Sequence, residues 1–439
     1  MARRPNIVLT IADDQRHDTI GALGNDWIRT PYQDAMAAAG TAFTCAHHHG
    51  SPHGAVCAPS RAMLFCGRTL ARVPEQLREP WRDHGEDAAL AEATPLLGEL
   101  LRGGGYHTHA VGKWHNGHRA FQRCFDSGEA LFFGGMCDHD KVPIDPFDPD
   151  GVYPRTRQSI GGKFSTELFT DAAVDFVRRY DDEQPFFLYV AYTAPHDPRT
   201  PPEEVRYAPD DVPLPRNFVP MHPFNNGELT IRDERLAAYP RTPREVRQHL
   251  ADYAGMLTDL DRGLGRLHAA LAESGLDENT LVIHTADHGL AVGQHGLMGK
   301  QNLYEHSTRV PLLLRGPDIP VDRRIDELCY QHDLYPTVLA LAGIEPPEPS
   351  DFRSLWPLLD GESGYERLTC SYAQCQQMVK DRTHKLIRYR RVNGRGSDRQ
   401  QVFAWRDDPY ELTDLADTPE GGEIAARLAQ HLTWEPLSS

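Results

Sequence analysis

Apolar runs alternate with amphipathic stretches over most of this 439-residue chain. The near-continuous apolar runs, typical of strands covered on both faces, lie at residues 6–12, 41–43, 106–111, 185–192, 279–286 and 309–314. Helical spacing occurs at residues 31–39, 94–102, 165–180, 243–274 and 333–341. This alternation predicts an α/β fold in which one large parallel or mixed sheet has helices on both faces.

The pattern of the chain changes after the proline pair at residues 346 and 347. Short alternating runs and one helical stretch follow at residues 367–372, 385–389 and 423–432. They predict a small antiparallel sheet with one helix. We therefore expect an α/β domain over residues 1–345 and a C-terminal α+β subdomain over residues 346–439.

Two proline-rich stretches interrupt the alternation of strands and helices. Residues 124–162 contain many prolines and aspartates, and no firm elements are predicted there. Residues 197–240 are also rich in proline and are long for a connection between two elements. We expect this second stretch to form a wall of the functional site.

The net charge of −17 limits the partners of this protein. Nucleic acid and anionic membrane surfaces are excluded as partners, because both repel a strongly acidic protein. No apolar run approaches the ~20 residues that a membrane-spanning helix needs. The first five residues lead directly into a strand and leave no room for a signal peptide, so a cytoplasmic location is expected, or a periplasmic one if a leader has been removed. The 8 cysteines show no paired spacing and are expected to be reduced thiols.

Acidic residues stand at the carboxyl ends of two predicted strands. Asp13 and Asp14 follow the first strand, and Asp287 and His288 follow a later one. Open α/β sheets place their ligands at this edge. Three carboxylates that converge there cannot all stay ionised without a cation, and hard oxygen ligands suit Ca²⁺ or Mg²⁺, with Mn²⁺ as a softer alternative. Imidazole is a poor ligand for a hard cation, so His288 could instead hydrogen-bond a bound anion. Taken alone, each acidic pair would be interpreted as solvated loop residues.

Cys57 lies at the start of a predicted helix. Pro59 suits a first helical turn, and Ser60 and Arg61 lead into the apolar run at residues 62–65. Unpaired backbone N–H groups and the positive end of the helix dipole meet at such a place and favour an anion. A cysteine there is expected to be an activated thiolate.

Basic side chains form a second group at the predicted strand ends, near Cys57 and in a glycine-rich loop. They are Arg61, Lys113, His115, His196 and Lys300. Each one alone would be interpreted as a solvated surface group. Together they would supply the positive charge that a tetrahedral oxyanion needs in an otherwise acidic protein. A histidine is also the natural proton donor to a leaving alkoxide near neutral pH.

Six motifs occur along the chain in one order. They are Asp13-Asp14, Cys57-Ala58-Pro59-Ser60-Arg61, Gly112-Lys113-Trp114-His115, Pro195-His196, Ala286-Asp287-His288-Gly289 and Gly299-Lys300. Their content and order resemble the type I sulfatases, which have the alkaline-phosphatase-like fold. The string at residues 408–416 is similar to the C-terminal subdomain of that family. The resemblance covers most of the chain and implies a large mixed sheet between helices, followed by a small antiparallel-sheet subdomain.

The resemblance also implies a chemistry. Cys57 would be oxidised to formylglycine by a formylglycine-generating enzyme, and one hydroxyl of the hydrated aldehyde would ligate the metal and attack sulfur. Ca²⁺ would be bound by Asp13, Asp14, Asp287 and residue 57, with His288 at a position where the family often has asparagine. The substrate would be a small anionic sulfate ester.

The basic residues receive individual roles from the same resemblance. Arg61 and Lys113 would hold the hydrated aldehyde and help to neutralise the sulfate. His196 and Lys300 would contact the sulfate and the leaving oxygen, and one of them would protonate it. His115 would take a proton from the second hydroxyl, so that sulfate is expelled and the aldehyde returns.

Three functions remain open from the sequence. The first is a sulfatase that acts on a sulfated carbohydrate, with choline sulfate or an aryl sulfate as alternative substrates. The second is a phosphonate monoester or phosphodiester hydrolase of the same superfamily. Lys113 and His115 argue against it, because those relatives carry neutral groups at these positions. The third is a non-catalytic binding protein on the same scaffold, which the complete set of expected residues disfavours.

Other conspicuous residues are assigned no chemistry. The histidines at 47–49 and His53 precede Cys57 and could line a substrate pocket, but we expect a solvated loop there. Cys66 is expected to be a buried small apolar residue, and Trp114 is expected to pack in the core.

Overall fold

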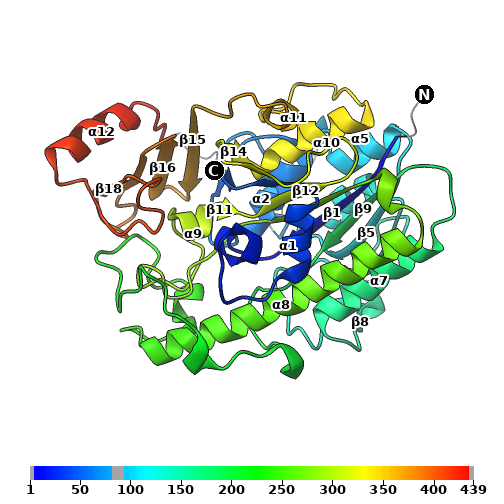
Figure 1. Cartoon of the computed structure of the whole chain (residues 1–439), viewed down its shortest axis with the longest axis horizontal. Coiled ribbons are helices and arrows are strands. Elements are labelled where there is room, and N and C mark those ends of the chain that lie inside the picture. Colours follow the sequence, from blue (N-terminus) through cyan, green and yellow to red (C-terminus); the bar gives the residue numbers. More distant parts are fainter. Residues whose placement is uncertain (1–3, 82–92, 435–439) are drawn as a thin grey trace.

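The computed structural model describes residues 4–81 and 93–434, and its central layer is an eight-stranded sheet (Figure 1). In spatial order the strands are β13 (Arg323–Ile325), β2 (Thr41–Phe43), β12 (Leu312–Arg315), β10 (Thr280–Ala286), β1 (Asn6–Ala12), β9 (Phe186–Ala191), β5 (His107–Lys113) and β6 (Ser127–Phe132). Within this sheet β12 alone runs against its neighbours, so the predicted mixed sheet is confirmed.

Strands β1, β9 and β10 form the centre of the sheet. They are buried along their whole length and rich in Val, Ile, Leu and Phe, as strands covered on both faces must be. The parallel register places Ala12 of β1 beside Ala286 of β10. It also places Ile11 beside Ala191 of β9. The three strands therefore end at one edge, where the residues that follow them can meet.

Helices cover both faces of the sheet (Figure 1). One layer contains α1 (Pro31–Ala38), α7 (Ser165–Arg179) and α8 (Pro243–Glu273), and the other contains α2 (Cys57–Cys66), α5 (Leu97–Gly103) and α10 (Leu334–Ala342). The long helix α8 begins where Thr242 accepts a hydrogen bond from the backbone N–H of Glu245, with Pro243 in the first turn. The predicted arrangement of a sheet between two helical layers is confirmed.

Strand β6 corrects the prediction that residues 124–162 hold no firm elements. It is the edge strand of the main sheet and pairs with β5, with a register irregularity at Val111 and Gly112. Only its last three residues are buried, because an edge strand is covered less completely than a central one. The apolar signal of β6 is therefore too short to detect in the sequence.

The C-terminal region forms a separate five-stranded sheet. Its spatial order is β18 (Arg399–Phe403), β17 (Lys385–Tyr389), β16 (Gln376–Asp381), β15 (Arg367–Tyr372) and β4 (Gly50–Ser51). The pairs among the four C-terminal strands are antiparallel, as predicted. Helix α12 (Pro419–Ala429) packs on this sheet and starts earlier than predicted, because Thr418 accepts a hydrogen bond from the backbone N–H of Gly421. Strand β4 joins the sheet from the segment just before Cys57, which ties this region to the larger one. The boundary at residue 345 stays a prediction.

Further short strands and α-helices lie among the described residues, together with several 3-10 helices of three or four residues. The strands are β3 (Ala46–His47), β7 (Pro143–Ile144), β8 (Ser159–Ile160), β11 (Arg309–Val310) and β14 (Cys329–Tyr330), and the α-helices are α3 (Glu75–Arg78), α6 (His118–Cys124), α9 (Glu305–Thr308) and α11 (Trp356–Leu359). In the part of the chain that the structure describes, no helix combines the length and the apolar character needed to cross a membrane.

Candidate active site

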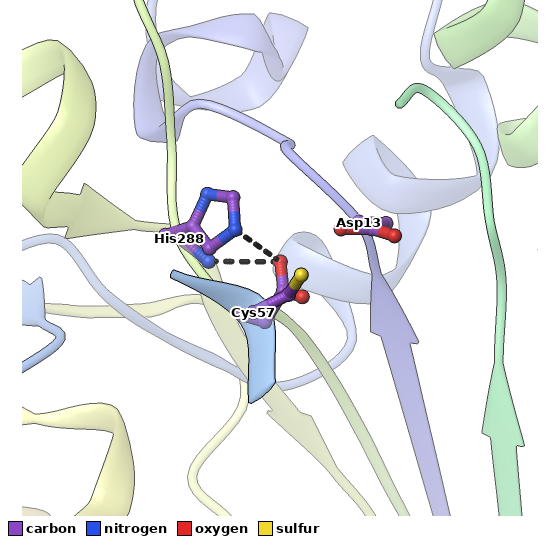
Figure 2. Close-up of side chains that lie close together, drawn as sticks. Asp13, Cys57 and His288 are labelled. Atoms are coloured by element: carbon purple, nitrogen blue, oxygen red, sulfur yellow. Dashed lines mark hydrogen bonds and ion pairs between the residues drawn. The ribbon is translucent and has the colours of Figure 1, made fainter. Parts of the chain in front are cut away.

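The carboxyl ends of four central strands bring the predicted site residues into one region. Asp13 and Asp14 follow β1, Asp287 and His288 follow β10, Lys113 ends β5, and His115 and His196 lie shortly beyond β5 and β9. Cys57 and Arg61 enter from the first turns of α2, and Lys300 enters from the irregular segment between β10 and α9. Figure 2 shows the side chains of Asp13, Cys57 and His288 lying close together, although they come from distant parts of the sequence.

Three carboxylates share a small buried volume at the centre of this region. Asp13, Asp14 and Asp287 are each at most 2% exposed. The backbone N–H of Asp14 donates to Asp287 Oδ1 at 3.2 Å, which joins the ends of β1 and β10. Ligand atoms of Asp13, Cys57, Asp287 and His288 lie within 4.8 Å of one another. Such a group has the composition and the size of a metal site.

The charge state of these carboxylates fits a cation. Burial raises the pKa of Asp287 to about 6, and the neighbouring Asp13 carboxylate raises it as well. Burial alone would raise the pKa of Asp13, but Lys113 and the other basic side chains around it together hold that pKa well below its usual value. In the same way Lys300 lowers the pKa of Asp14 against the effect of burial. Among the described residues, Asp13 Oδ1 has no hydrogen-bond partner. A cation here would bind that oxygen and favour the ionised form of Asp287.

His288 lies between two of the carboxylates. Its Nδ1 is 3.3 Å from Asp14 Oδ1, and its Nε2 is 3.6 Å from Asp287 Oδ1. Burial alone would lower the pKa of His288, but Asp287 and Asp14 outweigh burial and raise it. The imidazole is therefore beside any cation that the carboxylates hold, and it pairs with them when the cation is absent.

Cys57 is the first residue of α2 and is 3% exposed. Its Sγ is 3.4 Å from His115 Nδ1 and 3.6 Å from Lys113 Nζ. Burial alone would raise the pKa of the Cys57 thiol, but Lys113 and His115 hold it well below the ordinary value. The positive end of the α2 dipole acts in the same direction. Residue 57 is thus a site where negative charge is stabilised.

Lys113 and Arg61 are fully buried and fixed by several partners. Lys113 Nζ is paired with the Asp13 carboxylate and donates to the carbonyl oxygen of Gly135 at 2.6 Å. Arg61 Nε donates to Asp287 Oδ2 at 3.0 Å, and its Nη1 donates to the Tyr189 hydroxyl at 3.0 Å. No described residue accepts a hydrogen bond from Arg61 Nη2. This nitrogen can therefore bind an anion without breaking an existing bond.

His196 and Lys300 complete the basic side of the site. Lys300 Nζ donates to Asp14 Oδ1 at 2.9 Å. His196 Nδ1 is 2.7 Å from the carbonyl oxygen of Asp197, which can only accept, so Nδ1 carries a proton. Ligand atoms of Asp13, Asp14 and His196 lie within 4.8 Å of one another. Because Nδ1 of His196 is bonded to the carbonyl oxygen of Asp197, Nε2 is the ring atom available to exchange a proton.

Two residues of the site have left-handed backbone conformations. Asp14 has φ 75° and His115 has φ 66°. Such conformations cost non-glycine residues about 1–3 kcal/mol and persist where the surrounding contacts enforce them. Here they turn the chain sharply at two strand ends, so that both side chains face the centre of the site.

Three polar residues of this region were absent from the sequence prediction. They are Tyr189, which binds Arg61, Asp197, which binds His196, and Gln301, whose Nε2 donates to the carbonyl oxygen of Gly54 at 2.9 Å. Asp197 and Gln301 directly follow two predicted residues, which is a usable sequence signal. Tyr189 lies inside an apolar run, where its hydroxyl gives no separate signal.

The histidines before Cys57 correct another expectation. His47 and His48 are 0% and 2% exposed, so the predicted solvated loop is wrong for them. The reason is that β3 and β4 draw this segment into two small sheets. The ring of His48 lies 6.3 Å from that of His288, edge to face. Cys66 and Trp114 are 2% and 1% exposed, which confirms their predicted places in the core.

Known proteins resemble this chain over nearly its whole length. The sulfatase family profile matches residues 5–344, and the profile of the N-sulphoglucosamine sulphohydrolase C-terminal region matches residues 293–435. An arylsulfatase of Clostridium perfringens (strain 13 / Type A) is 27% identical over 463 residues and covers 95% of this chain and 91% of its own. The N-acetylglucosamine-6-O-sulfatase of Bacteroides thetaiotaomicron is 25% identical over 426 residues and covers 82% of this chain and 72% of its own.

One solved structure with the same fold belongs to an enzyme that is named for a different reaction. The phosphonate monoester hydrolase of Agrobacterium radiobacter matches with a TM-score of 0.75 and 20% identity, over 97% of this chain and 94% of its own. At this identity the likeness establishes the fold and leaves the reaction to the sequence relatives and the family profile. Because that profile spans most of the chain, the protein belongs to the sulfatase family of sulfuric ester hydrolases, in the alkaline-phosphatase-like superfamily.

Proposed function

We propose that this sulfatase removes sulfate from a small sulfated carbohydrate, with residue 57 as the nucleophile after conversion of cysteine to formylglycine. The setting of Cys57 carries the proposal. Its Sγ lies 3.4 Å from His115 Nδ1 and 3.6 Å from Lys113 Nζ, and it belongs to the same compact group as Asp13 and Asp287. A nucleophile needs a proton acceptor and a stabilising cation at such distances.

The buried basic side chains match the charge of a sulfate ester. Arg61, Lys113 and Lys300 are at most 5% exposed in a chain whose net charge is −17. Their positive charge is therefore concentrated where the substrate anion would bind, in a region from which water is largely excluded. We assign Arg61 and Lys113 to the sulfate oxygens, and His196 and Lys300 to the sulfate and the leaving oxygen.

The sulfatase family implies a divalent cation, and the residues present fit one. Asp13, Asp14 and Asp287 offer carboxylate oxygens, and Asp13 Oδ1 is buried without a described partner. Residue 57 and His288 form one compact group with Asp13 and Asp287, and Asp14 forms a second group with Asp13 and His196. Hard oxygen donors favour Ca²⁺, with Mg²⁺ and Mn²⁺ as alternatives. When bound, the cation supplies charge stabilisation for the sulfate oxygens and for the nucleophile.

Two histidines are suited to move protons. Burial lowers the pKa of His115, so its imidazole is neutral near pH 7 and can take a proton from the group at residue 57. His196 holds its Nδ1 proton on a backbone carbonyl, and its Nε2 can deliver a proton to the oxygen that leaves as the S–O bond breaks. Lys113 keeps its charge, because Asp13 raises its pKa against the effect of burial.

A ring-shaped substrate suits the surroundings of His115. Trp81 is 52% exposed, and its ring lies 5.7 Å from that of His115 and 5.0 Å from that of His53. An exposed aromatic face beside the reacting group can hold the apolar side of a sugar or aryl ring. The similarity to an N-acetylglucosamine-6-O-sulfatase supports a sulfated sugar over choline sulfate, which has no ring.

Phosphonate monoester or phosphodiester hydrolysis is the second candidate, because a phosphonate monoester hydrolase shares the fold. The contacts of Cys57 with Lys113 and His115 favour sulfate, since the resemblance implies neutral groups there in phosphonate hydrolases. Turnover of 4-nitrophenyl sulfate compared with that of a phenylphosphonate ester separates the two. Faster hydrolysis of the phosphonate would contradict the proposal.

The nucleophile is tested by Cys57→Ala, with Cys66→Ala as the matched control on the same helix. Both proteins are produced together with a formylglycine-generating enzyme, and intact mass reports whether the thiol has become an aldehyde. We expect Cys57→Ala to lose turnover of sulfated monosaccharides by roughly 1,000-fold or more, with an unchanged circular dichroism spectrum. Cys66→Ala should retain turnover, because Cys66 only packs in the core. Wild-type activity in Cys57→Ala would refute the assignment.

A further inference from the structure

Three consecutive side chains of the proline-rich stretch at residues 197–240 reach the edge of the active site. They are Arg232, Asp233 and Glu234, which have no counterpart among the predicted site residues. Arg232 binds the segment that carries His196, and Asp233 and Glu234 bind the segment that carries Lys300. The side chain of Arg232 is 46% exposed, that of Asp233 is 13% exposed, and that of Glu234 is 4% exposed. Two acidic side chains so little exposed, at the start of a short 3-10 helix (Asp233–Leu236), require specific partners.

Arg232 binds the residue that fixes His196. Its guanidinium forms a two-point ion pair with the Asp197 carboxylate, with Nη1 2.9 Å from Oδ1. The backbone carbonyl of Asp197 accepts the hydrogen bond from His196 Nδ1 at 2.7 Å. Arg232 Nη1 also donates to Asp233 Oδ1 at 3.2 Å. Because a two-point pair fixes orientation as well as distance, Arg232 holds the segment on which the His196 ring rests.

Asp233 joins the segments of Lys300 and Cys57. Its Oδ2 accepts a hydrogen bond from Gln301 Nε2 at 2.7 Å, and Gln301 directly follows Lys300. The same amide nitrogen donates to the carbonyl oxygen of Gly54 at 2.9 Å, three residues before Cys57. Gln301 is 3% exposed, so these two acceptors account for both protons of its amide.

Glu234 holds the backbone just before Lys300. Its carboxylate accepts hydrogen bonds from the N–H of Met298 at 3.0 Å and from the N–H of Gly299 at 3.0 Å. The buried Arg241 neutralises it, and the Tyr239 hydroxyl donates to it at 3.0 Å. The segment between β10 and α9 has no regular secondary structure at these residues, so its N–H groups depend on this side chain.

We propose that Arg232, Asp233 and Glu234 are positioning residues that fix His196 and Lys300 beside the leaving oxygen. The inference rests on the proposed function, in which these two residues contact that oxygen. His196 and Lys300 lie far apart in the sequence. The three side chains connect their segments directly, through hydrogen bonds and ion pairs. A displacement of about 1 Å at a reacting group can cost about 100-fold in rate.

A positioning role and a purely structural role predict different effects on substrates with different leaving groups. Protonation of the leaving oxygen matters most for esters of weakly acidic alcohols and phenols, and it matters little when the leaving group is stable as an anion. Loss of the fixed positions of His196 and Lys300 should therefore slow the hydrolysis of phenyl sulfate much more than the hydrolysis of 4-nitrophenyl sulfate. General destabilisation lowers the amount of active enzyme and slows both esters by the same factor.

The experiment compares kcat and KM for these two esters in Arg232→Met, with Arg235→Met as the control. Arg235 is an exposed arginine on the same stretch, whose Nε donates only to the nearby carbonyl oxygen of Thr230. For Arg232→Met we expect about a 100-fold loss of kcat on phenyl sulfate, about a 3-fold loss on 4-nitrophenyl sulfate and little change in KM. Arg232→Lys should recover part of the loss, and Arg235→Met should match the wild type.

Equal losses on the two esters, or no loss in Arg232→Met, would overturn the inference. If Arg232→Met is poorly folded by thermal denaturation, Asp233→Ala provides the same comparison at the neighbouring position, with Asp233→Asn as the variant that keeps the acceptor. A wild-type enzyme that hydrolyses neither ester, while its intact mass confirms formylglycine, would contradict the proposed function itself, and the inference would fall with it.

Discussion

Replacement of Glu305 by glutamine should destabilise the protein by breaking a buried network of charges. Glu305 belongs to α9, just beyond Lys300, and its Oε2 is 2.6 Å from Lys380 Nζ on β16. Its Oε1 is 3.1 Å from Lys385 Nζ on β17, and that nitrogen is 2.7 Å from Glu411 Oε1. These side chains are at most 3% exposed. The network therefore joins the C-terminal sheet to the segment that carries part of the active site.

The size of the effect follows from the charge balance. Lys380 and Lys385 face Glu305 and Glu411, and Arg309 Nη1 lies 3.7 Å from Glu305 Oε2, so Glu305→Gln leaves these cations with a single carboxylate. Breaking a buried pair in this way costs about 3–5 kcal/mol. Burial already lowers the pKa of Lys380 to about 8 even though Glu305 raises it. Keeping this ammonium ion charged at pH 7 thus costs the wild type roughly 3 kcal/mol, and it would cost the variant more.

The assay is thermal unfolding of the wild type and Glu305→Gln at pH 7 and at pH 9, with Glu366→Gln, whose side chain is 84% exposed, as the control. For a chain of this length, a loss of 4 kcal/mol lowers the midpoint by about 4 °C. The folded pKa of Lys380 lies below its unfolded value, so the unfolded state binds more protons between them and stability rises with pH from about 8. Without Glu305 the pKa of Lys380 is lower still, so the rise in stability begins at lower pH in the variant. The loss of stability relative to the wild type should therefore be smaller at pH 9 than at pH 7. A loss below about 1 kcal/mol at pH 7, or a deficit that grows at pH 9, would refute the reasoning.

Two further predictions concern the metal site and the buried histidines. Removal of divalent cations by chelation should abolish sulfatase turnover and lower the unfolding temperature, because Asp13, Asp14 and Asp287 repel one another without a cation; full activity after exhaustive dialysis against chelator would contradict this. Burial lowers the pKa of His284 to about 3, so the unfolded state takes up a proton near pH 6.5 that the folded state does not bind, and stability falls as pH drops through this range. His284→Gln should therefore lose about 2.5 kcal/mol less than the wild type between pH 7 and pH 4.5 in urea titrations, whereas parallel pH curves would contradict the assignment.

The residues that follow long buried strands could be predicted from the sequence. Asp13 and Asp287 could be placed together because β1 and β10 are apolar runs whose only compatible arrangement is a covered sheet with its carboxyl ends aligned. The short strands β3 and β4 give no such signal in the sequence, and neither does the burial of His47 and His48. Elements of two residues have no detectable period, so their pairing depends on partners that lie hundreds of residues away.

Sequence periodicity cannot indicate that residues 232–234 hold the segments of His196 and Lys300. Adjacent charged residues in a proline-rich stretch are ordinarily solvated, and their composition alone predicts an exposed loop. Glu234 is buried because the irregular segment before Lys300 has N–H groups that no neighbouring strand satisfies. A loop that presents a buried lysine needs an acceptor from outside the loop for its N–H groups. Which acidic side chain supplies it depends on how the intervening chain packs, and that packing is fixed only once the sheet and its helices have formed.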